Sequence, residues 1–189
     1  MDRAGIFIDH GYLQKLLEDY GIRHMDYLDF CEKLCEGGIT RFRTYLYDCM
    51  PYQSDPPTEE EKRHYASKQR FFTALNRMPR FEVKYGKLQK LPDPASLTGY
   101  KFVQKRVDVL MSVDIVRMSA EKQIFRIIMV TGDSDLVPAV MTAKDAGSEV
   151  WLYYANTART FAHDELREAC DECRELTQDF LNTIATYER

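Results

Sequence analysis

The sequence predicts an α/β fold: a Rossmann-like three-layer sandwich in which helices cover both faces of a mainly parallel, five-stranded sheet. Two observations predict it. Short apolar runs that end in turn residues are typical of buried strands, and they alternate with segments whose apolar residues recur at helical spacing. Strands that alternate with helices in this way lie parallel and are joined by right-handed crossovers.

The elements follow in order along the chain. The first strand is expected at 4–8, a continuous apolar run directly before Asp9, and the others at 39–48, 81–85, 124–130 and 150–154. Helices are expected at 13–20, 26–36, 58–76, 107–120, from the turn at 131–135 to 147, and at 160–187, with a loop at 92–99. We expect residues 1–155 to form the functional domain, and residues 156–189 to form an acidic helical extension packed on it.

The composition is that of a globular chain, with 44% hydrophobic and 30% charged residues. No stretch approaches the roughly 18 apolar residues of a membrane span, and the apolar run near the N-terminus is too short for a secretory signal. We therefore expect a cytoplasmic protein with no membrane partner. The acidic tail is interpreted either as packing and solubilising surface or as a contact surface for a homodimer or another partner.

The five cysteines are an odd number and several fall in expected helices, which favours reduced thiols over disulfides. Cys170 and Cys173 have the spacing of zinc ligands, and Cys31 and Cys35 would have to supply the second pair. Cysteines in amphipathic helices are more typical of small buried apolar residues, so structural zinc is the less favoured interpretation.

Charge is distributed unevenly along the chain. The net charge is −4, but the segment 62–106 holds twelve basic and two acidic residues and carries +10, which leaves −14 for the remainder. A concentrated basic stretch is typical of proteins that hold phosphates. Aromatic residues run through the same segment, and a few exposed rings would stack on bases, although most are expected in the core. Lysine-rich solvated helix faces produce the same pattern, so charge alone does not establish a nucleic-acid partner.

Three aspartates follow the ends of predicted strands. Asp9 ends the first strand, and Asp133 and Asp135 directly follow the strand at 124–130. Parallel sheets bind ligands at the carboxyl ends of their strands, so these carboxylates are expected to converge and to repel one another unless a cation is bound. Carboxylate oxygens suit Mg²⁺. The alternative is helix capping, which explains Asp133 or Asp135 more easily than both and does not explain Asp9.

Asp108 stands where a loop enters the helix at 107–120, and a capping role is the alternative there too. Asp114 lies six residues later, which is about 240° of helical rotation, so both cannot face one ion. We expect Asp108 to be the ligand and keep Asp114 as an additional candidate.

Three motifs resemble those of NYN domains, which are PIN-like ribonucleases, and the LabA-like branch is the most similar. The motifs are Ile6–Phe7–Ile8–Asp9 with His10–Gly11, Lys105–Arg106–Val107–Asp108–Val109 with Asp114, and Val130–Thr131–Gly132–Asp133–Ser134–Asp135–Leu136–Val137–Pro138. The resemblance covers nearly the whole chain up to Tyr154, and the third motif is its most specific part. It implies a metal-dependent nuclease, usually acting on RNA, with Asp9, Asp108, Asp133 and Asp135 as ligands.

Two positions depart from the family pattern. Tyr12 stands where the family usually has asparagine, and Arg106 stands where it usually has glycine after the motif lysine. Tyr12 removes a polar group that would orient a ligand, which would weaken or alter activity.

The function expected from these observations is hydrolysis of phosphodiester bonds, best suited to single-stranded RNA, with DNA as an alternative substrate. Mg²⁺ or Mn²⁺ held by the four aspartates would activate a water. Lys101, Lys105, Arg106 and Tyr12 are candidates for contacts to nucleic acid, and Thr131 and Ser134 for steadying a carboxylate or a metal-bound water.

Two other functions compete with the nuclease. The first is a catalytically weakened NYN-like module that binds RNA or a protein partner. The second is a phosphatase of the haloacid dehalogenase type, which also has an aspartate after its first strand. That chemistry requires a second acidic residue two positions after this aspartate, and here, two residues after Asp9, the chain has Gly11.

Overall fold

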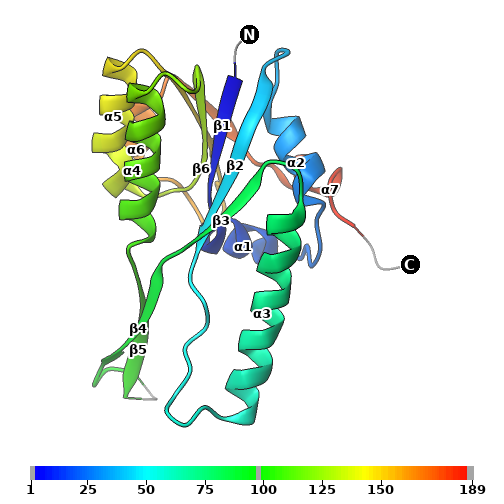
Figure 1. Ribbon diagram of the computed structural model, residues 1–189, viewed down its shortest axis with the longest axis vertical. Helices are drawn as coiled ribbons and strands as arrows, with labels where there is room; N and C mark the ends of the chain where they lie inside the picture. Colours follow the sequence, from blue (N-terminus) through cyan, green and yellow to red (C-terminus); the bar gives the residue numbers. More distant parts are fainter. Residues whose placement is uncertain (1–2, 97–98, 187–189) are drawn as a thin grey trace.

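A computed structural model describes residues 3–96 and 99–186 of the chain. Its main sheet has six parallel strands in the order β3-β2-β1-β6-β7-β8 (Figure 1). The strands are β1 (Arg3–Asp9), β2 (Thr40–Asp48), β3 (Phe81–Tyr85), β6 (Arg126–Val130), β7 (Glu149–Tyr154) and β8 (Glu172–Glu175).

Helices cover both faces of this sheet, so the three-layer α/β prediction is confirmed (Figure 1). One face carries α1 (His10–Asp19), α2 (Tyr27–Leu34), α3 (Glu59–Arg77) and α7 (Gln178–Asn182), and the other carries α4 (Val107–Ala120), α5 (Val137–Asp145) and α6 (Asp164–Ala169). Alternate side chains of β1 feed the two cores: Ile6 and Ile8 pack with α1, α2 and α3, whereas Phe7 packs with α4 and α5. Within the described ranges, no helix is long and apolar enough to cross a membrane.

The sequence predicted five strands and a helix over 160–187, and both expectations were wrong at the C-terminus. The segment breaks into α6, the strand β8 and α7. β8 has the sequence Glu-Cys-Arg-Glu and is the last strand of the sheet. It therefore pairs with one neighbouring strand, and its side chains remain partly or fully exposed. An edge strand of this kind carries little of the apolar signal from which strands are predicted.

A two-stranded antiparallel ribbon was also missed. β4 (Lys87–Pro92) pairs with β5 (Tyr100–Lys105). Of the loop predicted at 92–99, Pro92 ends a strand, residues 93–96 and 99 lie outside the strands, and residues 97–98 lie outside the described ranges. We call this hairpin the basic arm. In Figure 1 it extends beyond the main sheet, on the side where the strands end, as does the N-terminal part of α3. Its strands were missed because no residue of β4 is buried, nor is any residue of β5 whose side chain is described, so a regular apolar alternation is lacking.

The two cysteine pairs lie in different layers. Cys31 and Cys35 pack with the core on the α1–α3 face, whereas Cys170 and Cys173 pack with the core on the α4–α6 face. The sheet separates the pairs, so they do not form one four-thiol zinc site.

Candidate active site at the carboxyl edge of the sheet

Strand register brings the predicted acidic residues to one edge. β1 lies between β2 and β6, with Ile8 opposite Val130, so Asp9 and the turn that starts at Thr131 leave neighbouring strands at the same level. Asp9 is opposite Tyr47 on the other side, which places Asp48 beside it. The predicted convergence of strand ends is therefore present, with Asp48 as a further member.

Asp9 caps a helix, contrary to the sequence-based expectation. Its Oδ1 accepts a hydrogen bond of 3.1 Å from the backbone N–H of Tyr12, at the start of α1. The pKa of Asp9 is raised to about 6, mainly by burial and also by the charges of Asp108 and Asp48, against the lowering effect of that hydrogen bond. A cap alone favours the ionised form, so the raised pKa reflects a crowded, partly buried acidic site.

Asp133 and Asp135 lie in the turn that opens α5. Asp133 caps the 3₁₀ turn η1 (Ser134–Leu136), because its Oδ1 accepts a 2.9 Å hydrogen bond from the N–H of Asp135. The buried hydroxyl of Thr131 accepts a 3.3 Å hydrogen bond from the N–H of Asp133 and so steadies this turn. Ser134 is half-buried and begins η1. Capping thus occupies one oxygen of Asp133 and leaves its second oxygen available to a ligand.

Asp108 is not a cap. Arg106 occupies the capping position of α4, in the left-handed conformation with φ of 75° and no side-chain hydrogen bond, and Asp108 is the second residue of the helix. Burial, followed by the charges of Asp133 and Asp135, raises the pKa of Asp108. Asp48 and Asp108 thus raise the pKa of Asp9, and Asp133 and Asp135 raise the pKa of Asp108. These carboxylates therefore share one region.

This donor set fits a hard divalent cation by its chemistry, since every candidate ligand is a carboxylate. Among residues 3–96 and 99–186, however, no three acidic, histidine or cysteine side chains are arranged as a ready-made cage. Mg²⁺ is usually held by one or two carboxylates together with waters and phosphate oxygens, so a closed protein cage is not required. The residues therefore fit an ion that is completed by water and substrate.

Asp114 is engaged by protein side chains of its own. It is buried, and its Oδ2 accepts a 2.9 Å hydrogen bond from the hydroxyl of Tyr47 and lies 3.5 Å from Nζ of Lys84. Arg117 Nη2 lies 3.3 Å from its Oδ1. These partners account for both oxygens, so its place as an additional ligand candidate is withdrawn and we assign it to anchoring α4 on β2 and β3.

Tyr12 packs against the motif turn and also lines the hollow that opens at this edge. Its ring is buried, and its hydroxyl accepts a 2.7 Å hydrogen bond from the backbone N–H of Ala155 at the end of β7. Its ring also faces Gly132, where an added Cβ would lie 2.5 Å from Tyr12 Cε2 and 2.3 Å from the carbonyl oxygen of Phe161. Tyr12 thus links α1, the motif turn and the loop after β7, and its expected contact to nucleic acid stays a prediction.

A hollow of about 420 Å³ opens at this edge. Asp9 and Asp133 line it together with three side chains that sequence analysis missed, Lys15, Arg159 and His163. Arg159 is itself anchored 3.4 Å from Asp19 of α1. The acidic groups of this hollow suit a cation, and the cationic groups beside them suit the phosphate of a phosphodiester. Residues 159–163 follow β7 at its carboxyl end, so the rule that located Asp9 would have located them.

Asp48 belongs to a second, buried network that sequence analysis missed. His10 Nδ1 donates to Asp48 Oδ2, and the hydroxyl of Tyr27 lies 2.9 Å from His10 Nε2. Lys68 Nζ lies 2.7 Å from the same Asp48 oxygen. Burial alone would raise the pKa of Asp48, but these partners hold it below its ordinary value, while burial lowers the pKa of His10. Asp48 is therefore a paired carboxylate beside Asp9.

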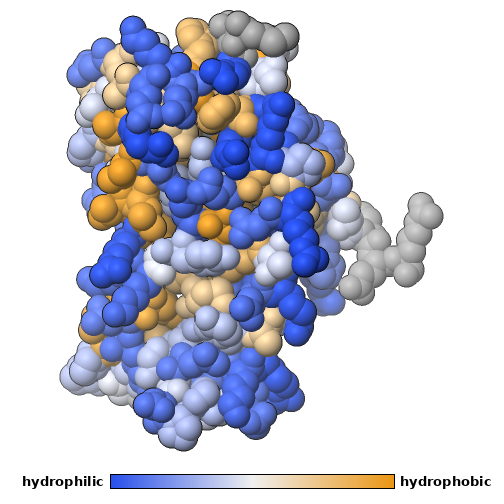
Figure 2. All heavy atoms as spheres, in the orientation of Figure 1, coloured by the Kyte–Doolittle hydropathy of each residue, from blue (hydrophilic) through white to orange (hydrophobic). Residues whose placement is uncertain are grey.

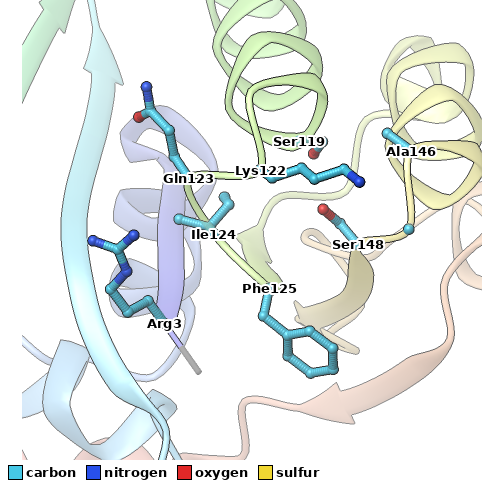
Figure 3. A pocket seen from close by; sticks show the side chains of 9 residues that line it. Arg3, Ser119, Lys122, Gln123, Ile124, Phe125, Ala146 and Ser148 are labelled. Atoms are coloured by element: carbon cyan, nitrogen blue, oxygen red, sulfur yellow. The ribbon is translucent and has the colours of Figure 1, made fainter. Parts of the chain in front are cut away.

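A different hollow, of about 320 Å³, lies at the opposite edge of the sheet (Figure 3). Arg3, Lys122 and Phe125 line it near the amino ends of β1 and β6, and none of its lining residues is acidic. Ligands of parallel α/β sheets bind at the carboxyl ends of strands, so the acidic edge is the better candidate.

Comparison with known proteins agrees with this architecture. A crystal structure of a protein of unknown function from Vibrio parahaemolyticus matches 95% of this chain and 96% of that one, with a TM-score of 0.62 and 21% sequence identity. That likeness shows the fold alone. No curated protein matches the chain. The family model of the NYN domain matches residues 3–177, which include β8, and the chain therefore belongs to the NYN domain family.

Proposed function

We propose that this protein is a metal-dependent nuclease that hydrolyses phosphodiester bonds, with single-stranded RNA in the cytoplasm as its substrate. The observation that carries the proposal is the gathering of Asp9, Asp108, Asp133 and Asp135 at the carboxyl edge, where mutual repulsion contributes to the raised pKa of Asp9 and Asp108. Membership of the NYN family, whose fold is nuclease-like, supports the same chemistry.

The second oxygen of Asp133, together with Asp9 and Asp108, would hold Mg²⁺ or Mn²⁺, and the exposed Asp135 of the same turn would supply a further carboxylate. When bound, such an ion polarises a phosphate and lowers the pKa of a water. The chain's own residues then have separate tasks. Lys15 and Arg159 attract the phosphate into the hollow, and the N–H of Tyr12 and the hydroxyl of Thr131 keep the first and third motifs in place.

The decisive variant is Asp133→Asn, because asparagine caps a helical turn about as well as aspartate does. We expect it to retain the folded state and to lose Mg²⁺- or Mn²⁺-dependent cleavage of a labelled single-stranded RNA by about 100-fold or more. Asp26→Asn is the matched control, since Asp26 caps α2 through the N–H groups of Leu28 and Asp29, outside the hollow. Equal cleavage by wild type and Asp133→Asn would overturn the nuclease, and binding of RNA without cleavage by either would favour the non-catalytic module.

A further inference from the structure

The basic arm, β4 and β5, is the part of the chain that the proposed active site does not explain. No residue of β4 is buried, and neither is any residue of β5 whose side chain is described. Among the described side chains of the arm, only that of Leu88, which is partly buried, packs against a core. A two-stranded ribbon of this kind is marginally stable by itself. Its retention as an ordered hairpin points to a role at the surface.

The base of the arm is fixed beside the acidic edge. Gly86 joins β3 to β4, its N–H donates a 2.8 Å hydrogen bond to the carbonyl of Asp48, and an added Cβ there would lie 2.7 Å from the carbonyl oxygen of Lys105. At the other end β5 stops at Lys105, three residues before Asp108. The six residues of each strand span about 20 Å from this base.

One face of the arm carries aromatic rings and a lysine. Lys90 pairs with Phe102, and the rings of Tyr52 and Phe102 lie 5.3 Å apart, between centroids. Tyr100 is in edge contact with Phe102 at 5.5 Å, and Lys90 Nζ lies 3.6 Å from the centre of the Tyr100 ring. Phe102 is nevertheless 47% exposed. A ring braced by its neighbours and open on one side is suited to stacking on a flat partner.

The other face, defined by the pairing of Lys87 with Lys105, is cationic. Lys87, Lys101 and Lys105 are exposed on it. Lys101 forms an ion pair with Asp93, with 3.7 Å between Nζ and Oδ2. The lower end of the molecule, where the arm and the start of α3 lie, is predominantly hydrophilic in Figure 2. Phosphates are the partners that such a lysine set attracts over a distance.

We propose that the basic arm is a binding platform for single-stranded polynucleotide, with a base stacked on Phe102 and phosphates held by the lysines of β4 and β5. This proposal adds a binding surface for the substrate of the proposed active site, and it rests on that proposed function. A strand lying along the arm runs toward Lys105 and hence toward Asp108. Single strands are the fitting ligand because only an unpaired base presents a free ring face to Phe102.

The test measures binding without divalent cation, so its outcome does not depend on cleavage. The affinity of the full chain is measured in EDTA by fluorescence anisotropy. Three labelled ligands are compared: an oligouridylate of about 12 nucleotides, its DNA counterpart and a duplex. We expect Phe102→Ala to weaken single-strand binding by about 5- to 100-fold. Phe102→Leu, which keeps apolar bulk without a ring, should resemble Phe102→Ala. Phe125→Ala is the matched control, because Phe125 is 46% exposed at the opposite edge (Figure 3).

The lysines are tested by salt dependence. Replacing Lys87 and Lys90 with glutamine should reduce the slope of log affinity against log salt by about 1.4 between about 50 and 200 mM salt, whereas Lys122→Gln should leave the slope unchanged. Stronger binding of duplex than of single strand, no binding of either RNA or DNA, or unaltered affinity in Phe102→Ala would overturn the platform. Binding that depends on Phe102, without cleavage in Mg²⁺ or Mn²⁺, would overturn the nuclease and leave the platform standing.

Discussion

Asp9 combines two demands that conflict. As a cap it must accept a hydrogen bond from Tyr12, and as a member of the acidic edge it is partly buried beside Asp108 and Asp48. Its pKa rises from 3.8 to about 6, so the folded protein binds this proton more tightly than the unfolded chain. Folding stability is therefore lost as the pH rises from about 4 to about 6, and the loss persists at neutral pH.

The variant Asp9→Asn removes this charge but keeps a capping oxygen. In EDTA at pH 7.5 we expect it to be more stable than wild type by about 1–3 kcal/mol, and below pH 4 the difference should vanish. Thermal unfolding across the pH range measures it. Added Mg²⁺ or Mn²⁺ should stabilise wild type and not the variant, because the variant lacks one carboxylate. A variant less stable than wild type at pH 7.5 would show that the Asp9 charge is compensated within the protein.

Arg106 is the second residue with a conflict. Its backbone adopts φ of 75°, a left-handed conformation that glycine adopts without strain. In any other residue this conformation reduces the stability of the folded state by about 1 kcal/mol. We expect Arg106→Gly to raise stability by up to about 1 kcal/mol, after allowance for the greater entropy of an unfolded glycine. The neighbouring Lys105→Gly lies in a strand and should lower stability. Urea unfolding of both variants checks the opposite signs.

At the scale of elements, the turn after β6 is clamped by its neighbours. Gly132 lies between the ring of Tyr12 in α1 and the backbone of Phe161 after β7, and its carbonyl accepts a 3.1 Å hydrogen bond from the N–H of His163. The position of Asp133 therefore depends on elements that are far apart in the sequence.

The methyl group of Gly132→Ala has no room, since it would meet a backbone oxygen at 2.3 Å. We expect a loss of about 3 kcal/mol or more in the free energy of unfolding, and displacement of Asp133 with loss of metal-dependent activity. Gly5→Ala is the comparison, because its methyl would meet mainly the flexible end of Ile124, at 2.9 Å, and ring atoms of Phe7. An equal loss of unfolding free energy in the two variants would show that the close contacts around Gly132 do not constrain it more than those around Gly5.

At the scale of the whole molecule, charge and apolar surface are distributed unequally. Basic residues are concentrated in the arm and in α3. The arm and the N-terminal part of α3 both extend beyond the main sheet on the side where its strands end (Figure 1). Figure 2 also shows an apolar patch over α4, the helix on which Val109 and Val113 are exposed. The segment after 155 is tied to the rest by β8 and by an antiparallel bridge between Met25 and Ala185.

This tie predicts the effect of truncation. Leu166, Leu176, Leu181 and Ile184 are all buried, and burial of four such side chains contributes about 6–12 kcal/mol, which is comparable with the whole stability of a domain. We expect a chain that ends at 155 to lose its cooperative thermal transition, and one that ends at 186 to keep it. A stable, cooperative 1–155 fragment would instead establish the domain boundary expected from the sequence.

The sequence by itself determined the layered architecture and the acidic edge. Buried parallel strands are read from continuous apolar runs, and Asp9 and Asp133 follow two of them directly. Asp108 was located through the resemblance of its motif, since the preceding strand, β5, has no buried residue among those whose side chains are described and gives no such signal. The spacing argument that separated Asp108 from Asp114 agrees with the placement of Asp114 against Tyr47.

Only the tertiary structure decided the roles that depend on distant partners. Tyr12 packs against the motif turn and the end of β7 because Gly132 and Ala155 lie beside it, and Asp48 is a paired carboxylate because His10 and Lys68 reach it. β8 and the basic arm form through pairing with strands elsewhere in the chain, which local apolar periodicity does not encode. Strand ends can thus be predicted from sequence, whereas the contacts that set the charge of each side chain arise only on folding.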